Sequence, residues 1–206
     1  MSDDNSGTEN KVIFLGEAGV GKTSLIKVSI GEKFETTYNS SISLSYFPRK
    51  ININNKKYTF NLWDTIGQEK YRSLTKIFYK KSKIVIFVYD ISDINSYNNL
   101  KYWIDSVNNE LSNEKYIKAI IGNKSDLFLK EAISEKEAEE FAILNGAKFK
   151  TCSAKTDPLV FTKFLDQLFT EYILENEKNN NSQNEQNITI NNKKNKNKNK
   201  NKSKCC

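Results

Sequence analysis

Short apolar runs recur along the first 178 positions, separated by stretches in which apolar residues return every three or four positions. The runs at residues 12–15, 84–89 and 117–121 predict strands that are covered on both faces. Apolar and polar residues alternate on both sides of Asn54-Asn55, which predicts a β-hairpin whose second strand ends at Asp64.

Helical patterns fill the intervening segments. Residues 22–30 predict a helix that opens on a Gly-rich loop. Ser134 predicts the start of another helix, with Glu137 completing a capping box and Gly146 marking its end. Because strands and helices alternate, the sequence predicts an α/β fold with a mostly parallel sheet. The last predicted helix has a wide apolar face made by Phe161, Phe164, Leu165, Leu168, Tyr172 and Ile173.

Composition changes after Lys178, where Asn and Lys dominate and large apolar residues almost vanish. Such a segment cannot bury enough surface to offset its ordering entropy. The polar, acidic N-terminus lacks the pattern of a signal peptide. We therefore expect a flexible N-terminus at residues 1–10, one folded domain at 11–178 and a disordered tail at 179–206.

The formal charge of +7 belongs to the tail. Seven of the 32 Lys and Arg lie between residues 193 and 204, and the remaining 25 equal the 25 Asp and Glu. A neutral body with a basic arm favours tethering to a surface over binding to nucleic acid. The three cysteines make no disulfide framework, which fits a reducing compartment. The longest apolar run, residues 84–89, is too short to span a bilayer, so membrane attachment is expected through the C-terminus.

The first chemical motif has the form GxxxxGKT, after a predicted strand and before a predicted helix. Its glycines let backbone N–H groups turn toward phosphate oxygens, and the helix adds its positive N-terminal end. Lys22 is expected to reach the β- and γ-phosphates, and the Thr23 hydroxyl to ligate Mg²⁺. The alternative is a chance Gly-rich turn. The predicted nucleotide-binding residues here are Gly16, Glu17, Ala18, Gly19, Val20, Gly21, Lys22, Thr23 and Ser24.

A carboxylate and an amide near the end of the hairpin suit a magnesium-bound nucleotide. Asp64 can hold the hydration shell of Mg²⁺, and Gln68 can orient an attacking water. Each residue taken alone is ordinary in a turn or on a surface, and only its place after a phosphate loop gives it this role.

Two further segments suit a guanine base. Asp126 of Asn123-Lys124-Ser125-Asp126 can accept from guanine N1–H and the exocyclic amine, which adenine does not match. Lys124 can lie along the base, and Asn123 can tie this loop to the phosphate loop. A backbone N–H of Ser153-Ala154-Lys155 can reach the guanine oxygen. An ordinary polar turn and an ordinary strand end are the respective alternatives.

Together these motifs resemble the Ras superfamily of small GTPases, specifically the Rab family, over nearly all of residues 11–178. Rab-type segments recur as Lys70-Tyr71-Arg72-Ser73-Leu74-Thr75, Phe78-Tyr79-Lys80 and Phe87-Val88-Tyr89-Asp90-Ile91-Ser92. The resemblance implies the P-loop GTPase fold: a mostly parallel six-stranded sheet, helices on both faces and one antiparallel edge hairpin. It also implies a Mg²⁺-dependent GTP hydrolase that binds GTP and GDP, with Gln68 and Lys22 as catalytic residues.

The resemblance assigns further roles. It implies that Phe34 stacks on the guanine, that Ser41 ligates Mg²⁺ and the γ-phosphate, and that Gly67 senses the γ-phosphate. Two loops, near residues 33–47 and 65–79, are expected to respond to the nucleotide. An aromatic triad for effectors is implied at Tyr46, Trp63 and Phe78, although Trp63 and Phe78 also suit the core.

The tail matches a Rab-type double prenylation signal at Cys205 and Cys206. Two lipid chains and seven lysines together exceed what stable anchoring requires. The implied protein is a monomer that regulates vesicle trafficking on the cytoplasmic face of intracellular, and specifically endosomal, membranes while cycling with the cytosol. Its implied partners are an exchange factor, a GTPase-activating protein, an escort or dissociation inhibitor, and effectors; nucleic acid is not among them.

The chain departs from the Rab pattern in the segment from Ser40 to Tyr46, where most Rab proteins have Thr followed by Ile-Gly-Val-Asp-Phe, and at Ala18 and Ile66. The small residues of that segment resemble the endosomal Rab branch. Ser41 keeps the hydroxyl of the usual Thr but lacks the methyl that restricts its rotamer. Ala18 stands where many Rab proteins have Ser, and Ile66 replaces Ala beside Gly67. Ala18 and Ile66 leave open an alternative, a weakly hydrolysing scaffold that stays bound to GTP on membranes.

Overall fold

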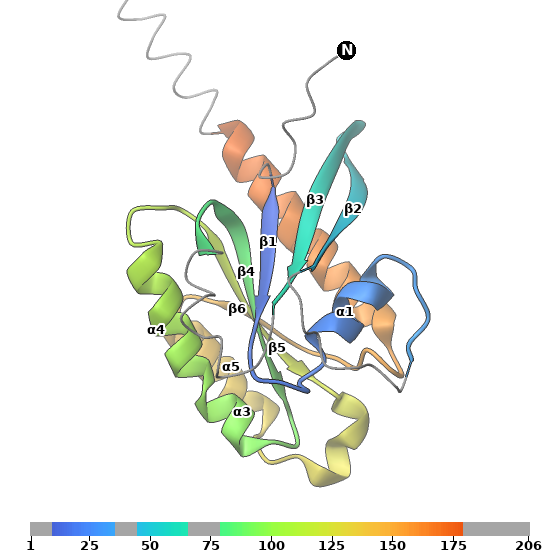
Figure 1. Cartoon of the computed structure of the whole chain (residues 1–206), viewed down its shortest axis with the longest axis vertical. Helices are drawn as coiled ribbons and strands as arrows, with labels where there is room; N and C mark the ends of the chain where they lie inside the picture. The colour runs from blue at the N-terminus through green and yellow to red at the C-terminus, as the bar shows by residue number, and fades with distance from the viewer. Residues whose placement is uncertain (1–9, 36–44, 66–78, 179–206) are drawn as a thin grey trace, which may run out of the picture. The chain divides into compact units, whose positions relative to one another are not determined.

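A computed structural model of the chain describes residues 10–35, 45–65 and 79–178 (Figure 1). Its strands form one six-stranded sheet in the order β2-β3-β1-β4-β5-β6. Neighbouring strands run parallel except β2 and β3, which form an antiparallel pair at one edge. The predicted sheet is confirmed. The strands are β1 (Lys11–Leu15), β2 (Ser45–Ile53), β3 (Lys56–Asp64), β4 (Ser82–Asp90), β5 (Ile117–Asn123) and β6 (Lys148–Thr151).

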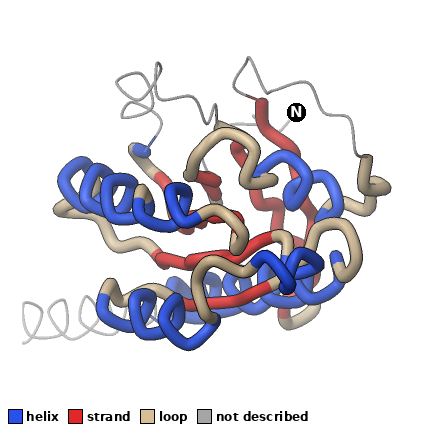
Figure 2. The backbone as a smooth tube through the Cα atoms, turned by 90° about the horizontal axis from the view of Figure 1, so that it is seen from below, coloured by secondary structure: helices blue, strands red, loops and turns tan. Residues whose placement is uncertain are grey.

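Helices cover both faces of the sheet (Figure 2). On one face Ile13 of β1 shares a buried core with Trp103 and Ala138. On the other face the ring of Phe14 meets Phe161 edge-on, with ring centroids 6.1 Å apart. The alternation of side chains along β1 thus supplies both cores. The helices are α1 (Lys22–Ser29), α3 (Ile94–Asn98), α4 (Leu100–Glu110), the 3₁₀ helix η2 (Ser125–Lys130), α5 (Glu135–Leu144) and a helix at 158–178.

The β2–β3 hairpin turns at Asn54 and Asn55, whose φ angles are 51° and 62°. Two consecutive positive φ angles match the type I′ turn, which suits the twist of two-residue hairpins, and Asn tolerates that backbone. β2 begins at Ser45, well before the alternating pattern at Ile51. Its Pro48 lies in an edge strand, where a missing N–H is tolerated.

Helix α5 begins and ends as the sequence predicts. The Ser134 hydroxyl accepts a hydrogen bond from the Glu137 N–H at 3.2 Å. Past the helix, the Gly146 N–H donates to the Ile143 carbonyl and the Ala147 N–H to the Ala142 carbonyl, at 3.0 and 2.9 Å. This pair of bonds, with a φ of 61° at Gly146, is the Schellman arrangement that ends helices.

The chain divides into two compact units, one ending at Phe169 and the other beginning at Thr170 within the last helix. The sheet belongs to the first unit. The predicted domain boundaries near residues 10 and 178 stay predictions. In the described ranges, no helix combines the length and the hydropathy that a bilayer crossing requires.

Candidate functional site

The predicted motifs gather at one edge of the sheet. β1, β3, β5 and β6 are mutually parallel, so their carboxyl ends lie on the same side. The Gly-rich loop follows β1, Asp64 ends β3, Asn123 ends β5, and the segment beginning at Ser153 follows β6. The carboxyl ends of parallel strands are where open α/β sheets bind ligands.

The Gly-rich loop is packed too closely for side chains at two of its glycines. A Cβ atom on Gly16 would lie 2.1 Å from the Val88 carbonyl oxygen, and one on Gly21 would lie 2.2 Å from Asn123 Nδ2. Both glycines also have positive φ angles, 142° and 97°. The loop is therefore held between β4 and the end of β5.

Lys22 is a buried cation inside this loop. Its Nζ donates to the carbonyl oxygens of Gly16 and Glu17, each at 2.8 Å. Burial lowers the pKa of the Lys22 ammonium to about 8, against the opposing effect of the Asp64 and Glu17 carboxylates. A desolvated ammonium beside the backbone of a Gly-rich loop attracts a polyanion such as a chain of phosphates strongly.

Thr23 and Asp64 form an oxygen pair beside Lys22. The Thr23 hydroxyl donates to Asp64 Oδ2 at 2.6 Å, and Asp64 is only 2% exposed. A hydroxyl and a carboxylate are hard oxygen ligands of the kind that Mg²⁺ takes together with water and phosphate. The residues present therefore fit a magnesium ion.

The side-chain amide of Asn123 connects the end of β5 to two neighbouring loops. Asn123 Nδ2 donates to the Val20 carbonyl at 2.8 Å, and Asn123 Oδ1 accepts from the Ala154 N–H at 3.2 Å. Asn123 is buried, so these bonds are shielded from water. The phosphate loop and the two segments suited to a base are thus held in one arrangement.

Asp126 is fixed by the neighbouring segment. Ser153 Oγ donates to Asp126 Oδ1 at 2.6 Å. The same hydroxyl oxygen accepts from the backbone N–H groups of Lys155 and Thr156, both at 3.1 Å. The half-buried Asp126 carboxylate is therefore held in one orientation by the Ser153 hydroxyl.

Sequence reasoning missed two side chains that hold this site. Asp90, at the end of β4, pairs with the Lys124 ammonium at 2.7 Å. The indole Nε1 of Trp103 on α4 donates to the Glu17 carboxylate at 3.1 Å. Asp90 lies in a segment that carries the Rab resemblance, which was its only signal in the sequence. Trp103 had none beyond its helical spacing.

The remaining predicted residues divide into described and undescribed ones. Phe34 is half-buried, and Ala18 and Lys155 are exposed. Tyr46 is 57% exposed and stacks on Trp63, with ring centroids 5.3 Å apart and planes 29° apart. The following predictions lie outside the described residues: Ser41, Ile66, Gly67, Gln68, Phe78, Cys205 and Cys206.

Comparison with known proteins identifies the class. A family model described as the Ras family matches residues 11–174. The Rab-21 protein of Geodia cydonium is 39% identical over 156 residues, which cover 76% of this chain and 68% of the relative. Human Rab-21 is 37% identical over 176 residues, covering 84% and 78% of the two chains. Bovine Rab-8B is 36% identical over 146 residues, covering 71% and 70%.

A mostly parallel sheet with a Gly-rich loop of the form GxxxxGKT after its first strand agrees with the match to the Ras family, whose members are GTP hydrolases. The chain belongs to the Ras family of small GTPases, and its relatives place it among the Rab proteins.

Proposed function

We propose that this protein is a Rab-type switch that binds GTP and GDP with Mg²⁺, hydrolyses GTP slowly and recruits effectors in vesicle trafficking. The observation that carries the proposal is the Asn123 amide, which joins the phosphate loop to both segments suited to guanine. A nucleotide site requires a phosphate-binding loop and a base-binding segment at a fixed distance from each other. Either feature alone would not indicate a nucleotide.

In this proposal the phosphates lie against the Gly-rich loop, and Lys22 leaves its two carbonyl partners to contact them. Mg²⁺ is held by Thr23, with Asp64 on its water shell and Ser41 as a further ligand. When bound, the ion neutralises charge on the β- and γ-phosphates. Asp126 reads the base, with support from the Ser153 hydroxyl.

Hydrolysis is in-line attack by a water on the γ-phosphate. Gln68 orients the water and Lys22 stabilises the charge that develops. We assign Gly67 to sensing the γ-phosphate. A GTPase-activating protein accelerates this step, and an exchange factor replaces GDP by GTP.

Effector recruitment falls on the aromatic side chains at Tyr46, Trp63 and Phe78. The exposure of Tyr46 and its stacking on Trp63 support this assignment, because exposed aromatic clusters are common at protein interfaces. The nucleotide state acts on this surface through the loops near residues 33–47 and 65–79.

The membrane step rests on Cys205, Cys206 and the lysines between residues 193 and 204. An escort protein presents the two cysteines for prenylation, and a dissociation inhibitor returns the protein to the cytosol. The segment from Ser40 to Tyr46, with its small residues, resembles the endosomal Rab branch, which favours endosomal membranes as the destination.

Two measurements on the full chain test the switch. Fluorescent GDP should bind in the presence of Mg²⁺ and be displaced by GTP but not by ATP. Single-turnover hydrolysis should be slow, on the order of 10⁻⁴ per second as in the Ras case, and Gln68→Ala should slow it further. Equal displacement by ATP contradicts the base assignment. A rate that an activating protein and Gln68→Ala both leave unchanged supports the GTP-bound scaffold instead.

A further inference from the structure

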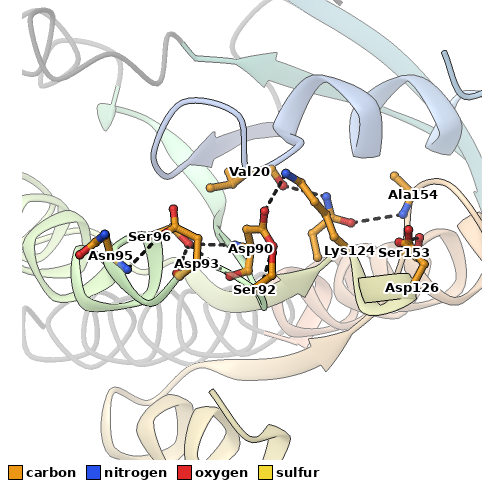
Figure 3. A network of polar contacts seen from close by, with 11 residues as sticks. Val20, Asp90, Ser92, Asp93, Asn95, Ser96, Lys124, Asp126, Ser153 and Ala154 are labelled. Atoms are coloured by element: carbon orange, nitrogen blue, oxygen red, sulfur yellow. Dashed lines mark hydrogen bonds and ion pairs between the residues drawn. The ribbon is translucent and has the colours of Figure 1, made fainter. Parts of the chain in front are cut away.

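An ion pair lies at the carboxyl end of β4, beside the base-binding loop (Figure 3). Lys124 Nζ is 2.7 Å from Asp90 Oδ2, and the two side chains are 34% and 11% exposed. Asp90 lies directly opposite Asn123 in the β4–β5 register, and the Ile91 N–H donates to the Asn123 carbonyl at 3.1 Å. The sheet itself therefore sets the distance between Asp90 and the loop.

The Asp90 carboxylate is held independently of Lys124. Its Oδ1 accepts from the Ser92 N–H at 2.9 Å and from the Ser92 hydroxyl at 2.7 Å. Burial alone would raise the pKa of Asp90, but the contacts with Lys124 and Ser92 outweigh it and lower the pKa below the ordinary value. Asp90 is thus a fixed anion, and Oδ2 presents its charge to the ammonium.

The backbone of Lys124 requires support. Its φ of 65° lies in the left-handed region, which a residue with a side chain adopts only where its surroundings hold it. The backbone around it is tied by the Ser125 N–H to the Cys152 carbonyl at 3.1 Å and by the Leu127 N–H to the Lys124 carbonyl at 2.8 Å. Among the contacts that the structure shows for the Lys124 side chain, Asp90 is the one that fixes its charged end.

We propose that Asp90 is a positioning residue for guanine binding, which holds the Lys124 ammonium so that the side chain lies ready along the base. This inference rests on the proposed function of the loop 123–126. Lys124 is a third exposed, so the ion pair fixes the tip of the side chain and leaves its stem accessible. The opposite role, in which Asp90 withdraws Lys124 from the nucleotide, predicts the opposite effect of removing the charge.

The central experiment compares Asp90→Asn with Asp93→Asn in the full chain with Mg²⁺. Asn at position 90 keeps an acceptor for Ser92 and loses the charge that binds Lys124. Asp93 lies three residues further on and is half-buried. Its Oδ1 accepts from the Asn95 N–H at 3.0 Å, a bond that Asn can also accept. Release of fluorescent GDP should be about tenfold faster in Asp90→Asn. This factor lies between the effect expected from losing an exposed ion pair and that expected from losing a buried one. Asp93→Asn should leave it unchanged.

A double-mutant cycle tests whether Asp90 acts through Lys124. Lys124→Met keeps the length of the side chain and removes the ammonium. Asp90→Asn should add little to the release rate in the Lys124→Met background, because coupled residues give non-additive effects. A full additional tenfold effect there would overturn the positioning role.

Inorganic triphosphate, which has no base, separates positioning from a general loosening of the fold. Its competition with fluorescent GDP should report the same triphosphate affinity in the parent and in Asp90→Asn. Equal weakening of triphosphate and GDP, slower GDP release in Asp90→Asn, or equal rates in both Asn variants would each overturn the inference. If the parent binds ADP as well as GDP, the proposed function fails first and the role of Asp90 falls with it.

Discussion

We predict that base selectivity depends on the Asp126 carboxylate. Asp126→Asn should shift preference from GTP toward xanthosine triphosphate, because an amide can donate to the xanthine oxygen where the carboxylate accepted from guanine. The variant keeps an acceptor for the Ser153 hydroxyl, so the loop should hold its shape. Competition of the two nucleotides against fluorescent GDP measures the shift. Asp157→Asn, an exposed change in the following turn, is the control, and an unchanged GTP preference in Asp126→Asn would remove Asp126 from the site.

Lys22 should take up a proton when nucleotide binds. Without nucleotide, burial holds the pKa of Lys22 at about 8, below its ordinary value of 10.5. A polyphosphate next to the ammonium favours the charged form and raises that pKa. Between the two values the complex binds more protons than the free protein, so GDP affinity falls as pH rises above about 8.

Calorimetry in two buffers of different ionisation enthalpy measures this uptake. Proton uptake should be clear about one pH unit above the pKa of Lys22 in the free protein. About one pH unit below that pKa it should be small, because Lys22 is then charged both in the free protein and in the complex. Uptake that does not change between these two pH values would show that another group is titrating.

At the scale of elements, the close contact between the phosphate loop and the end of β5 depends on Gly21. Gly21→Ala should abolish tight GDP binding, because the added Cβ would lie 2.2 Å from Asn123 Nδ2 and break its bond to Val20. Gly31→Ala is a matched control, because its φ of 94° resembles the 97° of Gly21. Among the described residues, its chain neighbours aside, no heavy atom lies within 4 Å of the new Cβ.

Each alanine must adopt a left-handed backbone, which lowers the free energy of unfolding by about 1–2 kcal/mol. Denaturant unfolding and GDP titration on each variant separate this shared cost from the clash. Gly31→Ala should lose stability and keep affinity. Comparable affinity losses in both variants would mean that backbone strain, and not the contact with Asn123, governs the loop.

Elements with a strong local signal were predictable. The alternation around Asn54-Asn55 gave the hairpin, and Ser134 and Gly146 gave both ends of α5. The first half of β2 was not predicted, since Pro48 and Arg49 interrupt the alternation. Arg49 is held by a distant partner, Asp166, at 2.7 Å. α4 buries Leu100, Trp103, Ile104 and Val107 at helical spacing, a periodic pattern that the sequence interpretation overlooked.

The candidate site also contains residues that the sequence could predict and residues that it could not. Motif residues carry their chemistry in the local sequence, so Lys22, Thr23 and Asp126 could be named without a structure. The residues that orient them could not, because the contact is made by the fold. Trp103 is 86 positions from Glu17, and Asp90 meets Lys124 only because β4 and β5 are neighbours.

At the scale of the whole molecule, the tail lysines and the lipid chains should contribute separately to membrane attachment. Cys205→Ser with Cys206→Ser should release the protein to the cytosol, because lysines alone act only within about a Debye length of the membrane. Changing the seven lysines between residues 193 and 204 to Gln, with the cysteines intact, should keep binding and weaken the preference for anionic lipid. Each lysine near an anionic leaflet contributes about 1 kcal/mol.

Flotation of the prenylated protein with neutral and with anionic vesicles separates the two contributions. The parent should float with both and favour the anionic vesicles, whereas the Gln variant should float equally with both. Raising the salt concentration should move the parent toward the Gln variant, since screening shortens the reach of the lysines. If the parent binds both kinds of vesicle equally at low salt, the lysines contribute no attraction and the two lipid chains alone carry attachment.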